Sequence, residues 1–181
     1  TQPDTAMILA AGLGTRMRPL TDTIPKPLVR LNDRALIDHV LDRLAAAGIK
    51  RAIVNVHHHA DKLEAHLKSR TDPAIKISDE RGVLLETGGG VVRALPLIGD
   101  KPFLIHNSDS VWIEGMGNNL SRLLSSWDDE RMDSLMLLAT TTGSLGYDGQ
   151  GDFHMDADGH LTRQSGPRLA PFVFAGVSIA R

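Results

Sequence analysis

The chain has 181 residues, a length that fits one domain with a small additional lobe. It contains no cysteine, which excludes disulfides, thiolate zinc sites and cysteine nucleophiles, and its formal net charge of -2 argues against a nucleic-acid-binding protein that works through bulk positive charge. The hydrophobic fraction of 41% is that of a globular protein. No apolar run reaches the roughly 18 residues of a membrane span, and no signal-peptide pattern opens the sequence, so we expect a soluble cytoplasmic protein with no membrane partner.

The first two thirds of the sequence alternate short apolar strands with amphipathic helices. The predicted elements are, in chain order, a strand at 6–11, a helix at 35–47, a strand at 52–56, a helix at 60–67, a strand at 75–77, a helix at 87–95 and a strand at 102–105. Thr87 is the predicted N-cap of the third helix. Strands that alternate with helices of this length predict a mostly parallel sheet covered on both faces, an α/β fold.

The last third of the sequence does not continue this regular alternation of strands and helices. A helix at 118–127 and a strand at 134–139 are followed by a polar stretch, residues 143–159, that is interrupted by glycines, and then by a strong strand at 172–179. We therefore expect an α/β core over residues 1–141. Residues 142–181 are expected to form a smaller lobe and one strand that returns to the core.

The most informative segment, residues 12–21 and 25–28, directly follows the first strand. Its glycines let the backbone approach phosphate oxygens, Arg16 adds a planar charged group, and Lys26 lies between two prolines. A Walker A loop is excluded because no lysine is followed by serine or threonine at the required spacing. A dinucleotide fingerprint lacks its third glycine, because Met17 stands there. The remaining alternative to a phosphate-binding loop is a glycine turn with a surface arginine.

These segments, together with residues 85–90 and 107–109, resemble the signature of the sugar-1-phosphate nucleotidyltransferases. The resemblance implies a doubly wound, Rossmann-like fold with a small sugar-binding lobe. It also implies an enzyme that joins a nucleoside triphosphate to a sugar 1-phosphate and releases pyrophosphate. UTP and N-acetylmuramate α-1-phosphate, in cell-wall sugar recycling, are the expected substrates. GTP with mannose 1-phosphate, or a nucleotide-sugar sensor without turnover, are the alternatives.

By the same resemblance, Arg16, Lys26 and Asp109 are the expected catalytic residues. The expected nucleotide-binding residues are Ala11, Gly12, Gly14, Thr15, Arg16, Lys26, Glu86, Thr87, Gly88 and Gly89. The expected sugar-phosphate contacts are Asn107, Gly151, Asp152 and Arg163. Gly88 to Gly90 at a helix start would let a flat base approach the backbone.

Magnesium is the expected cofactor, because it prefers carboxylates, phosphate oxygens and water. Asp109 is the candidate ligand, since it follows the strand at 102–105 and so lies at the edge of the sheet that carries the phosphate loop. Ser108 stands where the family usually has glycine. The family's second metal aspartate lies in a Trp-Asp-Gly segment that this sequence lacks, and we expect the chain to be incomplete at its C-terminal end. The oligomeric state stays open.

Three consecutive histidines, His57 to His59, suggest a metal site at first sight. Successive side chains point in different directions on a strand or a helix, so convergence on one ion is not expected. We predict a polar strand end instead. Trp112, in the loop beyond Asp109, is expected to shelter the site.

Overall fold

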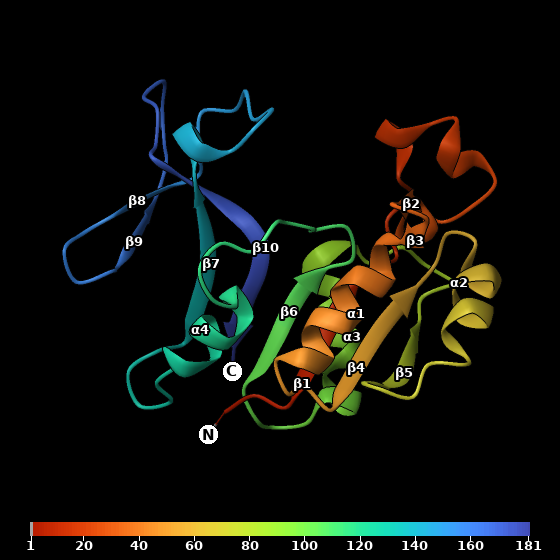
Figure 1. Ribbon diagram of the computed structural model, residues 1–181. Helices are drawn as coiled ribbons and strands as arrows, with labels where there is room; N and C mark the ends of the chain where they lie inside the picture. The colour runs from red at the N-terminus through yellow and green to blue at the C-terminus, as the bar shows by residue number, and fades with distance from the viewer. Residues whose placement is uncertain (1) are drawn as a thin grey trace.

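The computed structural model describes residues 2–181. Its centre is an eight-stranded sheet, drawn in Figure 1, in which β5, β4, β1 and β6 lie side by side and run parallel. The bounds of these parallel strands are β1 Thr5–Leu9, β4 Arg51–Val56, β5 Ala74–Asp79 and β6 Phe103–Asn107. Their carboxyl ends therefore meet at one edge of the sheet, the upper edge in Figure 1.

The other four strands extend the sheet in the antiparallel sense. They are β7 Ser134–Thr140, β8 Phe153–Met155, β9 Leu161–Arg163 and β10 Phe172–Ala180. β10 pairs with β7 along its length and with β6 through residues 177–180, while Phe172 pairs with β8. β8 and β9 form a hairpin that projects sideways from the upper part of β10, to the left in Figure 1. Residues 142–181 therefore hold both a projecting hairpin and a core strand, and their division from residues 1–141 stays a proposal.

Helices cover both faces of the parallel strands. The helices are α1 Leu36–Ala46, α2 Ala60–Leu67, α3 Glu86–Ile98 and α4 Asn119–Ser125. The apolar sides of α1, α2 and α4 pack with Ala6, Ile8 and Val54 in one core cluster. The apolar side of α3 packs with Met7 and Ile53 in a second core cluster. Because neighbouring residues of β1 and β4 alternate between the two clusters, the predicted doubly covered α/β sheet is confirmed.

The predicted helices at 35–47, 60–67 and 118–127 are confirmed, the last ending two residues early at Ser125. The predicted third helix is also confirmed and extends to Ile98, three residues further than expected, but its predicted N-cap was wrong. α3 begins at Glu86 and its N-cap position is Leu85, so Thr87 lies inside the first turn. The first turn of α3 is closely packed, because a Cβ on Gly90 would lie 2.8 Å from Asn55 Nδ2 and 3.0 Å from Glu80 Oε1. The glycines let the first turn of α3 lie against β4 and the end of β5.

The segment between β1 and α1 is irregular and compact. It contains three 3-10 helices and a two-stranded ribbon: η1 Thr15–Met17, η2 Leu20–Asp22, η3 Lys26–Leu28, β2 Arg30–Leu31 and β3 Arg34–Ala35. A fourth 3-10 helix, η4 Thr141–Gly143, follows β7. No helix among residues 2–181 has the length and apolar character needed to cross a bilayer.

Candidate active site

The predicted phosphate loop folds back on itself at Gly14. Gly14 has φ +65°, and a Cβ there would lie 2.9 Å from Thr21 Cγ2 and 3.1 Å from Lys26 Cβ. Thr21 is buried, and its hydroxyl donates to the Gly14 carbonyl over 2.8 Å. Glycine is therefore required at position 14 for this fold of the loop, because only glycine combines this backbone conformation with so close a neighbour.

A cavity of about 450 Å³ lies at the carboxyl ends of β1 and β6. It gathers eight of the predicted site residues from three separate segments: Ala11, Gly12, Arg16, Lys26, Glu86, Thr87, Asn107 and Asp109. Gly14, Thr15, Gly88 and Gly89 belong to the same segments but do not line this cavity. Within residues 2–181 the Arg16 guanidinium has no hydrogen-bond or ion-pair partner, so it can bind an anion.

Lys26 and Asp109 meet across the first cavity. The Lys26 ammonium forms an ion pair with the Asp109 carboxylate, and their side chains are 25% and 30% exposed. Lys26 comes from η3, and Asp109 lies two residues beyond β6. The fold thus brings the predicted catalytic cation and the predicted metal ligand into contact from positions 83 residues apart.

A second cavity, of about 430 Å³, adjoins the first and shares Asn107 and Asp109 with it. Most of its other lining is apolar and comes from the loop after β6, from β7 and from β10: Val111, Trp112, Ile113, Leu137, Leu138, Ala139, Phe174 and Ala175. Asp109 therefore stands where the two cavities meet. Ligands that occupied both would come together beside its carboxylate.

The remaining predicted sugar contacts lie outside both cavities. The Asp152 carboxylate accepts a hydrogen bond of 2.8 Å from the Phe174 amide, and Asp152 also joins β10 through its own backbone amide. Gly151 has φ +80° and packs against the Ala170 backbone. Arg163, on β9, is exposed. Asp152 thus fastens the β8–β9 hairpin to β10, and direct contact of these residues with a sugar stays a prediction.

Asn55 was missed by the sequence reasoning. It lines the first cavity although it is only 2% exposed. Its Oδ1 accepts from the Ala10 amide at 2.6 Å, and its Nδ2 donates to Glu80 Oε1 at 2.9 Å. The signal was a single amide side chain in the otherwise apolar strand predicted at 52–56, because a buried amide needs partners.

A buried histidine lies behind Asp109. His106 on β6 is fully buried and its Nδ1 donates to the Asn107 carbonyl at 2.7 Å. Its ring is stacked against Trp112 with 5.8 Å between centroids, and the Arg43 guanidinium of α1 lies 4.5 Å from the Trp112 ring centre. Arg43 also donates to the Trp112 carbonyl. This stack holds the loop that carries Asp109, and Trp112 forms a wall of the second cavity as expected.

Burial lowers the pKa of His106 to about 4, so the ring is neutral in the folded protein at pH 7. The unfolded chain binds a proton at this residue near pH 6.5, which means that stability falls as the pH drops below that value. Between pH 7 and pH 5 we expect a loss of about 2 kcal/mol in the free energy of unfolding from this group. Urea unfolding at the two pH values measures it. His106→Asn, which removes the titration, should lose correspondingly less; an equal loss in both proteins would contradict the assignment.

Two groups of side chains in the structure contain carboxylates that could bind a metal ion. Asp109 and Glu86 are the carboxylates that line the first cavity, and Asn107 adds an amide oxygen beside Asp109. Such hard oxygen donors, completed by phosphate oxygens, fit magnesium. The other group is Asp156, Asp158 and His160, which lie in the exposed turn of the β8–β9 hairpin and outside both cavities.

Comparisons with known proteins agree with this geometry. The nucleotidyl transferase family model matches residues 5–144. N-acetylmuramate α-1-phosphate uridylyltransferase of Caulobacter vibrioides is 50% identical over 99% of this chain and 76% of its own length. The enzyme of the same name from Neisseria meningitidis is 45% identical over 58% of this chain and 46% of its own. Mannose-1-phosphate guanyltransferase of Aspergillus fumigatus is 40% identical over 59% of this chain and 30% of its own.

The fold is that of solved nucleotidyltransferases. A crystal structure of UDP-glucose pyrophosphorylase complexed with UDP-glucose superposes with a TM-score of 0.78 over 98% of this chain and 76% of that one, at 19% identity. The inositol-1-phosphate CTP transferase of T. maritima also gives 0.78, over 99% and 71%, at 16% identity. The chain belongs to the nucleotidyl transferase family, as a sugar-1-phosphate nucleotidyltransferase. The family and fold expected from the sequence are confirmed.

Proposed function

We propose that the protein transfers a uridylyl group from UTP to N-acetylmuramate α-1-phosphate, with magnesium, and releases pyrophosphate. The observation that carries this proposal is the meeting of two cavities at Asp109, one lined by the phosphate loop and the other largely apolar. The choice of base and sugar is supported by the relative of that name that is 50% identical over 99% of the chain.

The reaction forms a bond between a phosphate oxygen of the sugar 1-phosphate and the α-phosphorus of UTP. The bond from that phosphorus to the bridging oxygen of the β-phosphate breaks, and pyrophosphate leaves with the electron pair. The second pKa of a phosphate monoester is near 6, so the nucleophile is mostly ionised at pH 7 and needs no general base. The protein must therefore hold two anions together and stabilise the charge on the leaving group.

The residues of the first cavity suit these tasks. Arg16 lies free in the loop and can bind the β- and γ-phosphates through its planar guanidinium. Lys26, beside the junction of the cavities, would bring its ammonium to the reacting phosphates. Asp109 would hold the magnesium ion, with Asn107 beside it. The ion would neutralise phosphate charge and orient the triphosphate.

A pyrophosphate-release assay tests the proposal. With magnesium, UTP and N-acetylmuramate 1-phosphate, we expect release at a kcat/KM at least about tenfold above that of any other pair in a panel of triphosphates and sugar 1-phosphates. Preference for GTP with mannose 1-phosphate would contradict the assignment of base and sugar. Nucleotide binding without release from any pair would contradict catalysis and favour a sensor.

A further inference from the structure

The three histidines after β4 each face a backbone carbonyl in one of the loops that flank the first cavity. His57 Nδ1 lies 2.7 Å from the Glu80 carbonyl oxygen, in the loop between β5 and α3. The other two histidines face carbonyls of η2, and a lysine of α2 faces the carbonyl of the residue after η2. These contacts are His58 Nε2 to Thr21 O (3.1 Å), His59 Nε2 to Asp22 O (3.0 Å) and Lys62 Nζ to Thr23 O (2.5 Å).

The direction of these hydrogen bonds follows from their chemistry. A carbonyl oxygen only accepts, so each ring nitrogen that faces one carries a hydrogen and donates it. A nitrogen that donates in this way has no lone pair for a metal ion. The carbonyls of residues 21, 22 and 23 are consecutive, and all three are held from one side by side chains of residues 58–62. Three donors on three successive peptide groups restrain the position of the whole segment.

This segment supports the phosphate loop directly. Thr21 is one of the three held residues, and its hydroxyl donates to Gly14 in the middle of the loop. Leu28 and Val29 donate their amides back to Pro25 and Lys26, so that Lys26 is enclosed in the same compact unit. The positions of Gly14 and Lys26 therefore depend on where residues 21–23 are held.

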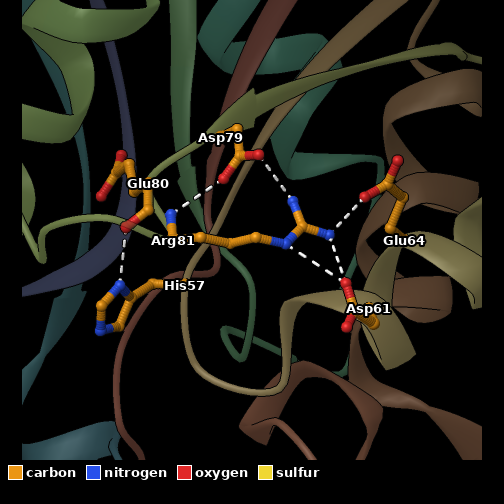
Figure 2. Close-up of polar contacts among 6 residues, drawn as sticks. All are labelled: His57, Asp61, Glu64, Asp79, Glu80 and Arg81. Carbon is orange, nitrogen blue, oxygen red and sulfur yellow. Dashed lines mark hydrogen bonds and ion pairs between the residues drawn. The ribbon is translucent and has the colours of Figure 1, made fainter.

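Residues of the same turn and helix also hold the second loop of the cavity. Figure 2 shows His57 at the Glu80 carbonyl and the Arg81 guanidinium between Asp79 of β5 and two carboxylates of α2. Arg81 Nη2 lies 2.7 Å from Asp61 Oδ1 and 2.6 Å from Glu64 Oε2. Residues 80 and 81 begin the loop that leads to Glu86 and Thr87, which line the first cavity.

We propose that residues 57–64, here called the β4–α2 anchor, position both loops of the nucleotide cavity. None of these residues lines either of the two cavities that meet at Asp109, so their role is positioning and not contact with substrate. The proposal rests on the proposed function in that the held loops bind the triphosphate. It assigns the three histidines a task in nucleotide binding and none in sugar binding, because the contacts reach only the loops of the first cavity.

Loss of the donors is expected to loosen the loops before any substrate binds. In the double variant His58→Ala/His59→Ala, amide hydrogen exchange at Met17, Leu28 and Val29 should be at least about tenfold faster than in the wild-type protein without ligand. The KM for UTP should rise about tenfold, while the KM for the sugar 1-phosphate stays within about twofold. Unchanged exchange and unchanged KM for UTP would overturn the proposal.

A second double variant tests whether the N–H donors of His58 and His59, and not the rest of their side chains, hold the loop. His58→Gln/His59→Gln keeps an N–H donor at a similar reach, and position 59, with φ +49°, bears the same backbone cost for glutamine as for alanine. We expect this variant to recover most of the protection and of the affinity for UTP; values equal to those of the alanine variant would overturn the role of the donors. His66→Ala is the matched control, because His66 of α2 bonds to Asp38 of α1 at 3.0 Å and touches neither loop.

A further variant and the absence of substrate in the exchange measurement keep the proposal testable if the alanine double variant fails to fold or the wild-type protein does not use UTP. Lys62 is exposed, so Lys62→Met should fold even if the alanine double variant does not, and faster exchange at Leu28 and Val29 is expected there as well. Its absence would contradict the proposal. Because exchange is measured without substrate, a wild-type chain that fails to use UTP would overturn the proposed function while the exchange result still decides whether residues 57–64 hold the loops.

Discussion

Alanine in place of Lys26 or of Asp109 is expected to lower kcat at least about 100-fold, equal to about 2.7 kcal/mol in the activation barrier. The two side chains form an ion pair at the junction of the cavities, where the proposed function places the charge of the transferring phosphate. Lys26→Ala would remove the cation proposed to bind the phosphates, and Asp109→Ala would remove the carboxylate proposed to hold magnesium. Steady-state rates of pyrophosphate release under saturating substrates measure both losses.

The rate of the double variant tests whether Lys26 and Asp109 act together. If the two residues serve one phosphate and one metal ion, the double variant Lys26→Ala/Asp109→Ala should be little slower than either single variant. Independent losses that multiply would contradict a shared task, and a wild-type kcat in either single variant would overturn its assigned role. Lys101→Ala, an exposed lysine before β6 that lines neither cavity, is the control and should keep the wild-type rate.

Gly176→Ala is expected to destabilise the fold by about 3 kcal/mol. Gly176 lies in the irregular stretch of β10 between Phe174 and Ser178 and has φ +83°. A Cβ there would overlap Ser110 Oγ and lie 3.0 Å from Asn107 Nδ2. The added methyl group therefore pushes on the loop next to Asp109, and we expect kcat/KM for the sugar 1-phosphate to fall about tenfold as well. Urea unfolding and steady-state kinetics measure the two effects.

Gly48→Ala separates backbone strain from steric overlap. Gly48 has φ +92°, but a Cβ there has no atom within 4 Å, so only the strain of about 1 kcal/mol is expected and the kinetics should not change. Equal destabilisation in the two variants would show that overlap with Ser110 is unimportant. That result would leave Gly176 without a part in shaping the second cavity.

Local patterns in the sequence were sufficient to predict the parallel half of the fold. The apolar spacing of residues 35–47 and 60–67 and the buried strands at 6–11 and 52–56 each depend on neighbours within one element. The segment between β1 and α1 could be singled out as a candidate phosphate-binding loop because its glycines, Arg16 and Lys26 lie close together in the sequence. Asp109 could be placed near it because carboxyl ends of parallel strands share one edge.

The rest depends on contacts between distant segments. The strand at 172–179 was predicted, but nothing in its residues shows that it runs antiparallel between β6 and β7. Gly88 to Gly90 were predicted to let a base approach a helix start, which stays a prediction; the packing of Gly89 and Gly90 against Leu85, Asn55 and Glu80 was not foreseen, because Asn55 is distant in the sequence. Asp152 was predicted to contact the sugar, which stays a prediction; the hydrogen bond from the Phe174 amide to its carboxylate could not be foreseen, because the two residues are distant in the sequence.

The ion pair at the junction of the cavities has a consequence for the order in which ligands load. In the absence of ligand, the charges of Lys26 and Asp109 neutralise each other, so each attracts a lone divalent cation or a lone polyanion only weakly. A magnesium–triphosphate chelate presents both signs at once and can exchange partners with both side chains in a single encounter. Under the proposed function, we therefore expect the paired state to favour the complex of metal and nucleotide over free metal and free nucleotide.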